Sequence, residues 1–164
     1  MNTETLELPP VVRDVAGQDE AARFLARALR TLGEGEKLVA SMTRAGFGQM
    51  MAAVSRGFDS AAADEYWKPF ATEDGRQGIL DLYRSGDFEK LGAYNGRLAE
   101  LGLPTLILWG DNDVFAPVAG AYRFRKEIPG AKLVLLEEAG HFVYADEPRR
   151  CAQEVSEFLA ESRV

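Results

Sequence analysis

Residues 103–117 read Leu-Pro-Thr-Leu-Ile-Leu-Trp-Gly-Asp-Asn-Asp-Val-Phe-Ala-Pro. The apolar run over residues 106–109 stops at Gly110, and Asp111 and Asp113 follow it. This run is too short for a helix and is apolar on both faces, which predicts a strand buried in a parallel sheet. In open α/β sheets, functional groups lie just past the carboxyl ends of such strands. We therefore expect the function of this chain to depend on the acidic loop that follows the strand.

The sequence after this loop predicts a βαβα unit and places the chain in the α/β fold class. The expected elements are a helix over 117–128, a strand over 132–136 and a helix over 147–162. Asp146 is placed to cap the last helix, whose apolar stripe consists of Cys151, Ala152, Val155, Phe158 and Leu159. A strand–helix–strand unit has parallel strands joined by a right-handed crossover. Asp113 and His141, the single histidine of the chain, then lie at the same edge of the sheet.

The first hundred residues are expected to be helical after an extended segment over residues 1–18, where Pro9-Pro10 forbids helix. Apolar spacing predicts a helix over 19–32 and then two short helices within 34–58, broken near Gly46 and Gly48. The next helix is capped by Asp59 or Ser60 and ends at 66–70. Two further helices are expected over 72–85 and 88–101. The helix over 72–85 should bury Ile79, Leu80, Leu82 and Tyr83. The chain thus divides into the segment 1–18, a helical region over 19–102 and a C-terminal part over 103–164.

The composition excludes several classes of function. The net charge of −7 over 164 residues, without a cluster of Lys or Arg, argues against a nucleic acid or an anionic membrane as partner. One histidine and one cysteine, Cys151, cannot form a His/Cys metal cluster within one chain, so we expect no metal. We expect no cofactor either. We predict a cytoplasmic protein for three reasons. The chain has a lone cysteine, it lacks an apolar run long enough for a bilayer, and its start lacks a basic segment followed by an apolar one.

Asp113 and His141 have the residue types and the chain order of a catalytic acid and base. A carboxylate that accepts a hydrogen bond from one imidazole nitrogen fixes the tautomer of the ring. The other nitrogen can then take a proton from a nucleophile or from water. Two alternatives stay open at this point: Asp113 could cap the helix that follows it, or Asp111 could be the acid.

The two loops resemble those of the α/β-hydrolase superfamily. Residues 110–117 resemble its Gly-x-x-Asp-x-x-x-Pro acid loop, and Gly140-His141-Phe142, followed by Asp146-Glu147-Pro148, resembles its histidine loop and the start of its last helix. The resemblance implies that Asp113 is the acid, which the spacing to the loop's final proline favours over Asp111, and that His141 is the base. The reaction of this family is hydrolysis through a covalent enzyme intermediate.

The helical region, with Tyr66-Trp67-Lys68-Pro69-Phe70, resembles the cap that covers the pocket in haloalkane dehalogenases and epoxide hydrolases. Residues 2–5 resemble the end of the family strand that leads into this cap, which makes Glu4 a weaker alternative acid. Trp67, Phe115 and Phe142 are then the candidate substrate-binding residues, although each could simply fill space in the core. The implied ligand is a small apolar molecule with a halide, ether, epoxide or ester bond.

The resemblance covers only the C-terminal portion of the hydrolase fold. The family nucleophile lies on a Gly-x-(Ser/Asp/Cys)-x-Gly turn, whereas the one pair of glycines four residues apart, Gly92 and Gly96, encloses Tyr94. Cys151 follows the histidine and lies on the apolar stripe of a helix, so it is not the nucleophile. We expect a truncated, hydrolase-like chain that is inactive alone. The alternative is a non-catalytic small-molecule-binding or self-assembling module derived from a hydrolase.

A two-stranded parallel sheet with two apolar faces leaves an edge and both faces to be covered. Three arrangements are open. The helical region folds back over the sheet, two chains join as a dimer, or a separate polypeptide supplies a complementing N-terminal half. We expect the dimer, because an uncovered strand edge pairs readily with another chain.

Overall fold

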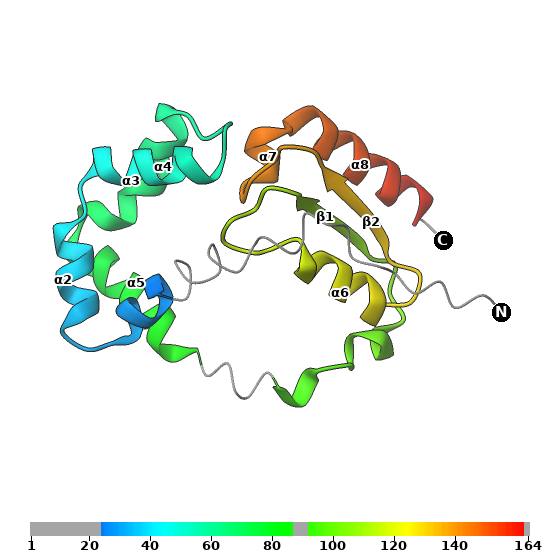
Figure 1. The fold of residues 1–164 in the computed structure, drawn as a ribbon, viewed down its shortest axis with the longest axis horizontal. Helices are drawn as coiled ribbons and strands as arrows, with labels where there is room; N and C mark the ends of the chain where they lie inside the picture. The colour runs from blue at the N-terminus through cyan, green and yellow to red at the C-terminus, as the bar shows by residue number, and fades with distance from the viewer. Residues whose placement is uncertain (1–23, 87–91, 163–164) are drawn as a thin grey trace.

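The computed structural model describes residues 24–86 and 92–162, which form two regions (Figure 1). The helical region comprises residues 24–86, and the sheet region comprises residues 106–161. Over its described residues the first region consists of helices and the loops that join them, and the described sheet lies wholly in the second. Within these residues, no helix has the length and apolar character needed to cross a lipid bilayer.

Helix caps define most of the helical region. Its helices are α2 (Glu34–Ser41), α3 (Arg44–Val54), α4 (Ser60–Ala71) and α5 (Glu73–Ser85). A helix over residues 24–30 precedes them and is the described part of the one expected over 19–32. Thr43, Asp59 and Thr72 each accept a hydrogen bond from a backbone N–H group, at 3.1, 2.8 and 3.1 Å. The caps at Asp59 and Thr72 confirm the predicted starts of α4 and α5.

The break expected near Gly46 and Gly48 is wrong in its position. The chain leaves the helix at Met42 and Thr43, and both glycines lie inside α3. Thr43 has an extended backbone and caps α3, which fixes the start of the helix there. Gly48 faces Ala63 of α4, and the packing of the two helices supplies the stabilisation that glycine lacks as a helix former.

The helical region buries two apolar clusters of its own. The larger consists of Phe47, Met51, Phe58 and Ala63, and the smaller of Leu29, Val39 and Leu80. Burial of Leu80 by α5 is confirmed, with Ile79 and Tyr83 half-buried, but Leu82 is 71% exposed. Leu82 lies about 200° around the helix from Leu80 and therefore points away from the cluster.

The helix expected over 88–101 is wrong for residues 92–101, while residues 88–91 lie outside the described part of the chain. Two short 3₁₀ turns form instead, one over residues 92–94 and one over Leu98–Leu101. Gly96 has a φ of 78°, which interrupts a helix at that point. The apolar spacing here does not mark a buried face, because Tyr94 and Leu101 are exposed.

The sheet region has the predicted βαβα order. Strands β1 (Leu106–Gly110) and β2 (Lys132–Leu136) are parallel and pair from Leu106–Lys132 to Gly110–Leu136. Helix α6 (Ala119–Glu127) connects them, and α7 (Val143–Asp146) and α8 (Pro148–Glu161) follow. Since the strands run in parallel and in register, the loops after Gly110 and Leu136 leave the sheet at the same edge.

Asp146 does not cap the last helix, contrary to the expectation. It is the final residue of α7, and the N-cap of α8 is Glu147, which makes no side-chain capping bond. The Asp146 carboxylate instead accepts hydrogen bonds from Gly140 of the sheet region and from Ser55 and Gly57 of the helical region. These nearby donors hold the carboxylate away from the end of α8.

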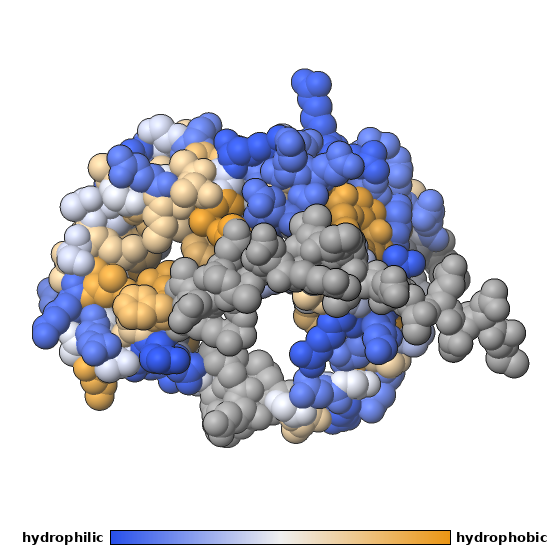
Figure 2. Space-filling view, viewed as in Figure 1, coloured by the Kyte–Doolittle hydropathy of each residue, from blue (hydrophilic) through white to orange (hydrophobic). Residues whose placement is uncertain are grey.

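The apolar stripe expected on the last helix is only partly buried. Cys151 is buried, but Val155 is 40% and Leu159 is 55% exposed. Glu154 is buried in their place, because its carboxylate pairs with Lys132 of β2 at 3.0 Å. This ion pair orients α8 over the strand and leaves apolar side chains at the surface. Figure 2 shows hydrophobic surface over both regions.

Candidate active site

The loops that follow the two strands hold each other in place. We call residues 111–117 the acid loop and residues 137–142 the histidine loop. Asn112 N donates a hydrogen bond to Ala139 O at 3.0 Å. A Cβ atom at Gly110 would overlap the Ala139 carbonyl oxygen, so this close approach of the two loops requires glycine.

Asp113 is fixed by the backbone of its own loop. Its Oδ1 accepts hydrogen bonds from Phe115 N at 2.9 Å and Ala116 N at 2.8 Å. Ala116 O in turn accepts a hydrogen bond from Trp109 Nε1 at 2.8 Å, and Asp113 is 7% exposed. The carboxylate does not cap α6, whose N-cap is Val118. Asp113 is thus a buried carboxylate of fixed orientation.

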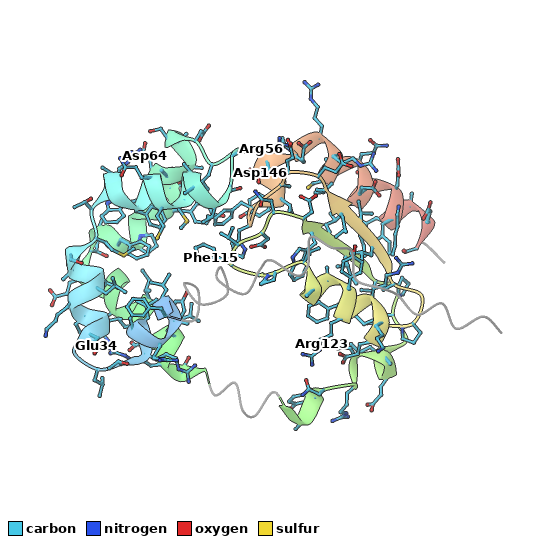
Figure 3. All side chains as sticks on the ribbon, viewed as in Figure 1. Glu34, Arg56, Asp64, Phe115, Arg123 and Asp146 are labelled. Atoms are coloured by element: carbon cyan, nitrogen blue, oxygen red, sulfur yellow. The ribbon has the colours of Figure 1, made fainter. Side chains whose placement is uncertain are left out.

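The Asp113 carboxylate faces the imidazole of His141. Nδ1 of His141 lies 2.9 Å from Oδ2 and 3.1 Å from Oδ1 of Asp113. The backbone N–H of His141 donates to Val54 O at 2.9 Å, which ties the histidine loop to the end of α3. Phe115, which lies between the two regions in Figure 3, and Phe142 pack their rings nearly perpendicular to the imidazole. The structure thus brings together the two residues predicted as acid and base.

This pairing changes the chemistry of the imidazole. The hydrogen bond to the Asp113 carboxylate raises the pKa of His141 above its ordinary value of 6.5, while partial burial acts in the opposite direction. Because Nδ1 donates to a carboxylate, Nε2 carries the lone pair of the neutral ring. Within the described residues, the hydrogen bonds of the ring are all on Nδ1. Nε2 is therefore available to accept a proton.

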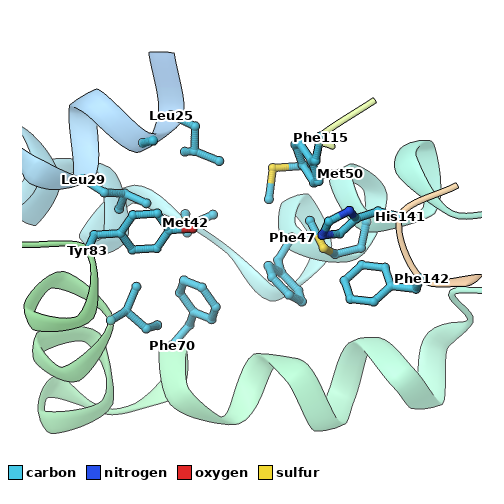
Figure 4. A pocket seen from close by; sticks show the side chains of 13 residues that line it. Leu25, Leu29, Met42, Phe47, Met50, Phe70, Tyr83, Phe115, His141 and Phe142 are labelled. Carbon is cyan, nitrogen blue, oxygen red and sulfur yellow. The ribbon is translucent and has the colours of Figure 1, made fainter. Parts of the chain in front are cut away.

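His141 lines one end of an apolar cavity of about 320 Å³ (Figure 4). The other lining residues come from both regions: Leu25, Ala26, Leu29, Met42, Phe47, Met50, Met51, Phe70, Ile79, Tyr83, Phe115 and Phe142. Apart from the imidazole and the Tyr83 hydroxyl, these side chains are aliphatic, aromatic or thioether. Such a cavity suits an apolar ligand, and it places the end of that ligand beside the imidazole.

The three candidate substrate-binding residues have different positions. Phe115 and Phe142 line the cavity. Trp67 lies behind the wall, where it stacks on the lining residue Phe70 with ring centroids 5.4 Å apart and also packs against Phe47. Trp67 therefore shapes the cavity through its neighbours in the aromatic cluster.

Of the two alternative acids, Asp111 makes no hydrogen bond to the imidazole in the described structure. The carboxylate that bonds to Nδ1 of His141 belongs to Asp113, and one oxygen of Asp111 is buried without a partner among the described residues. Glu4 lies outside the described residues. The geometry of the site is thus that of an Asp113–His141 pair.

Sequence reasoning missed the part of the cavity that the helical region contributes, including Met42, Met50 and Tyr83. Their apolar spacing indicates a helix face, but it carries no signal that this face lines a cavity. The interaction of Asp146 with Gly140 was also missed. The position of Asp146 just before Glu147-Pro148 predicts a helix cap, and this local pattern gives no sign of the bond to Gly140.

The fold agrees with a comparison against known families. The profile of the α/β hydrolase fold family matches residues 11–148, and the chain belongs to this family. Its parallel two-stranded sheet with flanking helices is consistent with a C-terminal part of that fold.

Particular relatives match over part of their length. A crystal structure of a loop variant of the haloalkane dehalogenase DbeA from Bradyrhizobium elkanii aligns with a TM-score of 0.71 and 25% identity, over 89% of this chain and 52% of that one. Human monoacylglycerol lipase ABHD6 is 38% identical over 61 residues, which are 37% of this chain and 18% of the lipase. The uncharacterized hydrolase YugF of Bacillus subtilis is 25% identical over 103 residues, 62% of this chain and 36% of YugF. The chain thus spans about half, or less, of the length of these proteins.

Proposed function

We propose that this chain supplies the acid, the base and the cap of a hydrolase active site, with Asp113 as the acid and His141 as the base. One observation carries the proposal: Nδ1 of His141 lies 2.9 Å from the buried Asp113 carboxylate while the ring lines an apolar cavity. Membership of the α/β hydrolase family supports it, as do the haloalkane dehalogenase and the monoacylglycerol lipase among the relatives.

In the proposed reaction, Asp113 accepts the hydrogen bond from Nδ1–H of His141 and fixes the tautomer whose free nitrogen is Nε2. Nε2 then takes the proton from a serine nucleophile. Where the nucleophile is an aspartate, Nε2 takes the proton from the water that hydrolyses the covalent intermediate. The carboxylate stabilises the resulting imidazolium, in keeping with the raised pKa of His141.

The proposed substrate is a small apolar molecule with a halide, epoxide or ester bond. Phe115 and Phe142 would hold it beside His141, because both line the cavity and pack on the imidazole. Trp67 would support the opposite wall through its stacking on Phe70. The near absence of polar groups in the lining favours an apolar chain over a charged one.

The nucleophile is proposed to come from outside this chain. The sequence has no Gly-x-(Ser/Asp/Cys)-x-Gly turn, and the residues after Gly92 form a 3₁₀ turn that follows no described strand. The described lining of the cavity includes no Ser, Cys or Asp. On this proposal the chain alone does not turn over substrate, and a complementing N-terminal half restores the reaction.

Turnover of short-chain esters, haloalkanes and epoxides by the purified chain, measured beside His141→Ala, tests this proposal. Equal background rates are expected for the two proteins. A rate that His141→Ala abolishes would show that the chain has its own nucleophile. That result would overturn the proposed inactivity while supporting the role of the base.

Ligand binding tests the cavity without any turnover. The single histidine gives one imidazole Cε1–H resonance, so titration with 1-octanol should move that resonance in the wild type. Met50→Trp, which fills the cavity, should abolish the response, and Leu32→Trp, on an exposed side chain, should retain it. No response in the wild type would exclude an apolar site beside His141.

A second candidate function, a non-catalytic module that self-assembles, is favoured by the exposed apolar side chains on α8 and just before β1. Val155 and Leu159 of α8 and Leu103 before β1 are all exposed. Such side chains are typical of surfaces that another chain covers, and a second copy is the proposed partner. Light scattering at micromolar concentration should give the mass of a dimer, and a clean monomer would exclude this arrangement.

A further inference from the structure

The carboxylate of Asp146 lies where the helical region meets the sheet region (Figure 3). Its Oδ1 accepts hydrogen bonds from Ser55 Oγ at 2.7 Å and from Gly57 N at 2.6 Å. Its Oδ2 accepts a hydrogen bond from Gly140 N at 2.6 Å. One side chain therefore joins the α3–α4 loop (residues 55–59) to the histidine loop.

The donors that meet Asp146 are shielded from water. Ser55 and Gly140 are buried, and Gly57 is half-buried. A buried donor that loses its acceptor costs about 1–3 kcal/mol. Hydrogen bonds to an ionised carboxylate are also stronger than those between neutral groups. The hydrogen bond to Asp146 therefore fixes the backbone at Gly140.

The backbone of the next residue, His141, is also fixed. The backbone N–H of His141 donates to Val54 O at 2.9 Å, directly before Ser55. Two consecutive residues of the histidine loop are therefore tied to the end of α3, one directly and one through Asp146. The backbones are also closely packed at this junction, because a Cβ atom at Gly140 would overlap Val54 O and one at Gly57 would overlap Ala145 O.

We infer that Asp146 is a positioning residue for His141: by fixing Gly140 against the α3–α4 loop, it holds the imidazole in hydrogen-bonding contact with Asp113. The importance of the His141 position for a reaction rests on the proposed function. The hydrogen bonds that join Asp146 to the two loops do not depend on it. The charge that acts directly on the imidazole is that of Asp113. Asp146 acts through the backbone, so its removal should lengthen the bond between Nδ1 and the Asp113 carboxylate.

The pKa of His141, read from the Cε1–H resonance of the only histidine in the chain, tests the inference. Asp146→Asn and Asp146→Ala should lower it by about 0.5, and Asp113→Asn should lower it further. Ser55→Ala removes one donor of the carboxylate without removing a charge, and it should lower the pKa by a smaller amount. Thr72→Ala removes the side-chain cap of α5, which lies outside both the α3–α4 loop and the histidine loop, and should leave the pKa unchanged.

Each result decides the question. Suppose that the pKa stays within about 0.1 of the wild type in both Ser55→Ala and Asp146→Asn, while the melting temperature falls as it does in Thr72→Ala. Asp146 would then be a purely structural tether, and the inference would be overturned. A shift in the Asp146 variants but none in Ser55→Ala would assign the effect to charge and overturn it as well. Should Asp146→Ala not fold, Ser55→Ala and Asp146→Asn still decide. If Asp113→Asn fails to lower the pKa, the acid–base pair of the proposed function fails instead.

Discussion

The helical region and the sheet region each leave large apolar side chains exposed, but helices α5 and α8 differ in the type of residue that they bury. The helical region buries Phe47, Ala63 and Leu80 against its own helices, with Leu80 only 2% exposed. In the sheet region, α8 leaves Val155 and Leu159 at the surface while it buries a glutamate. Both helices carry apolar residues three or four positions apart in the sequence. Spacing therefore predicts that a helix has an apolar face, but the neighbours that are present decide whether the face is buried.

The contact between the two regions offers the test with the largest expected effect. Gly140→Ala should lower the free energy of unfolding by about 4 kcal/mol, because its Cβ would overlap the Val54 carbonyl oxygen at the junction. Gly78→Ala is the matched control: it lies inside α5 with no atom near its Cβ, and it should raise the free energy by up to about 1 kcal/mol. Urea unfolding measures both. Equal effects of the two substitutions would show that the regions do not meet at Gly140.

The difference in burial between Leu80 of α5 and Leu159 of α8 predicts the next effect. Leu80→Ala should lower the free energy of unfolding by about 3 kcal/mol, because it leaves a cavity in the smaller cluster of the helical region. Leu159→Ala, on the exposed face of α8, should change it by less than about 0.5 kcal/mol. The same urea unfolding measures both variants. If Leu159→Ala lowers the free energy of unfolding by several kcal/mol, the apolar stripe of α8 is covered in solution, and the predicted difference between Leu80 and Leu159 is wrong.

Helix caps distinguish the regions on a smaller scale. The starts of α3, α4 and α5 have side-chain caps, whereas those of α6, α7 and α8 have none. Thr72→Ala should therefore cost about 1 kcal/mol, because Gly75 N loses its acceptor. Thr72→Ser keeps the hydroxyl and should retain most of the stability in thermal unfolding. If both variants lose the same amount, the hydroxyl does not cap α5.

The smallest expected effect is the pH dependence of stability due to His141, whose side chain is 38% exposed. Its pKa in the folded chain is raised above 6.5, so the folded state binds the proton more tightly than the unfolded state does. The resulting stabilisation is complete below pH 6.5 and disappears as the pH rises through the folded pKa. Urea unfolding of the wild type and His141→Gln at pH 5.5 and 8.5 measures it, and the advantage of the wild type should shrink at the higher pH. An advantage that grows with pH would contradict the raised pKa.

Much of the fold could be predicted because its signals are local. The apolar run that ends at Gly110 predicts β1, and the run over residues 132–136 predicts β2 with the bounds that the structure shows. Asp59 starts α4 through its own capping bond. The approach of Asp113 to His141 followed from one topological rule, since parallel strands deliver their following loops to the same edge.

The errors occur where a residue's partner is distant in the chain. Leu82 looks like a core residue by composition, but the direction of the cluster is set by Leu29 and Val39 of other helices. Asp146 has the spacing of an N-cap, yet Ser55 and Gly57 compete successfully for its carboxylate. No local pattern contains these partners, so the cavity and the bonds of Asp146 become visible only in three dimensions.

The bonds of Asp146 also have a consequence for folding kinetics. The Ser55–Asp146 bond joins residues 91 positions apart, and the Gly57–Asp146 bond joins residues 89 apart. Contacts of such long range require closure of a large loop and form late compared with helix caps and local turns. The imidazole should reach its final position only in the last folding step, after both regions have formed. A protease cut between residues 92 and 105 would turn this step into a bimolecular association, which dilution weakens.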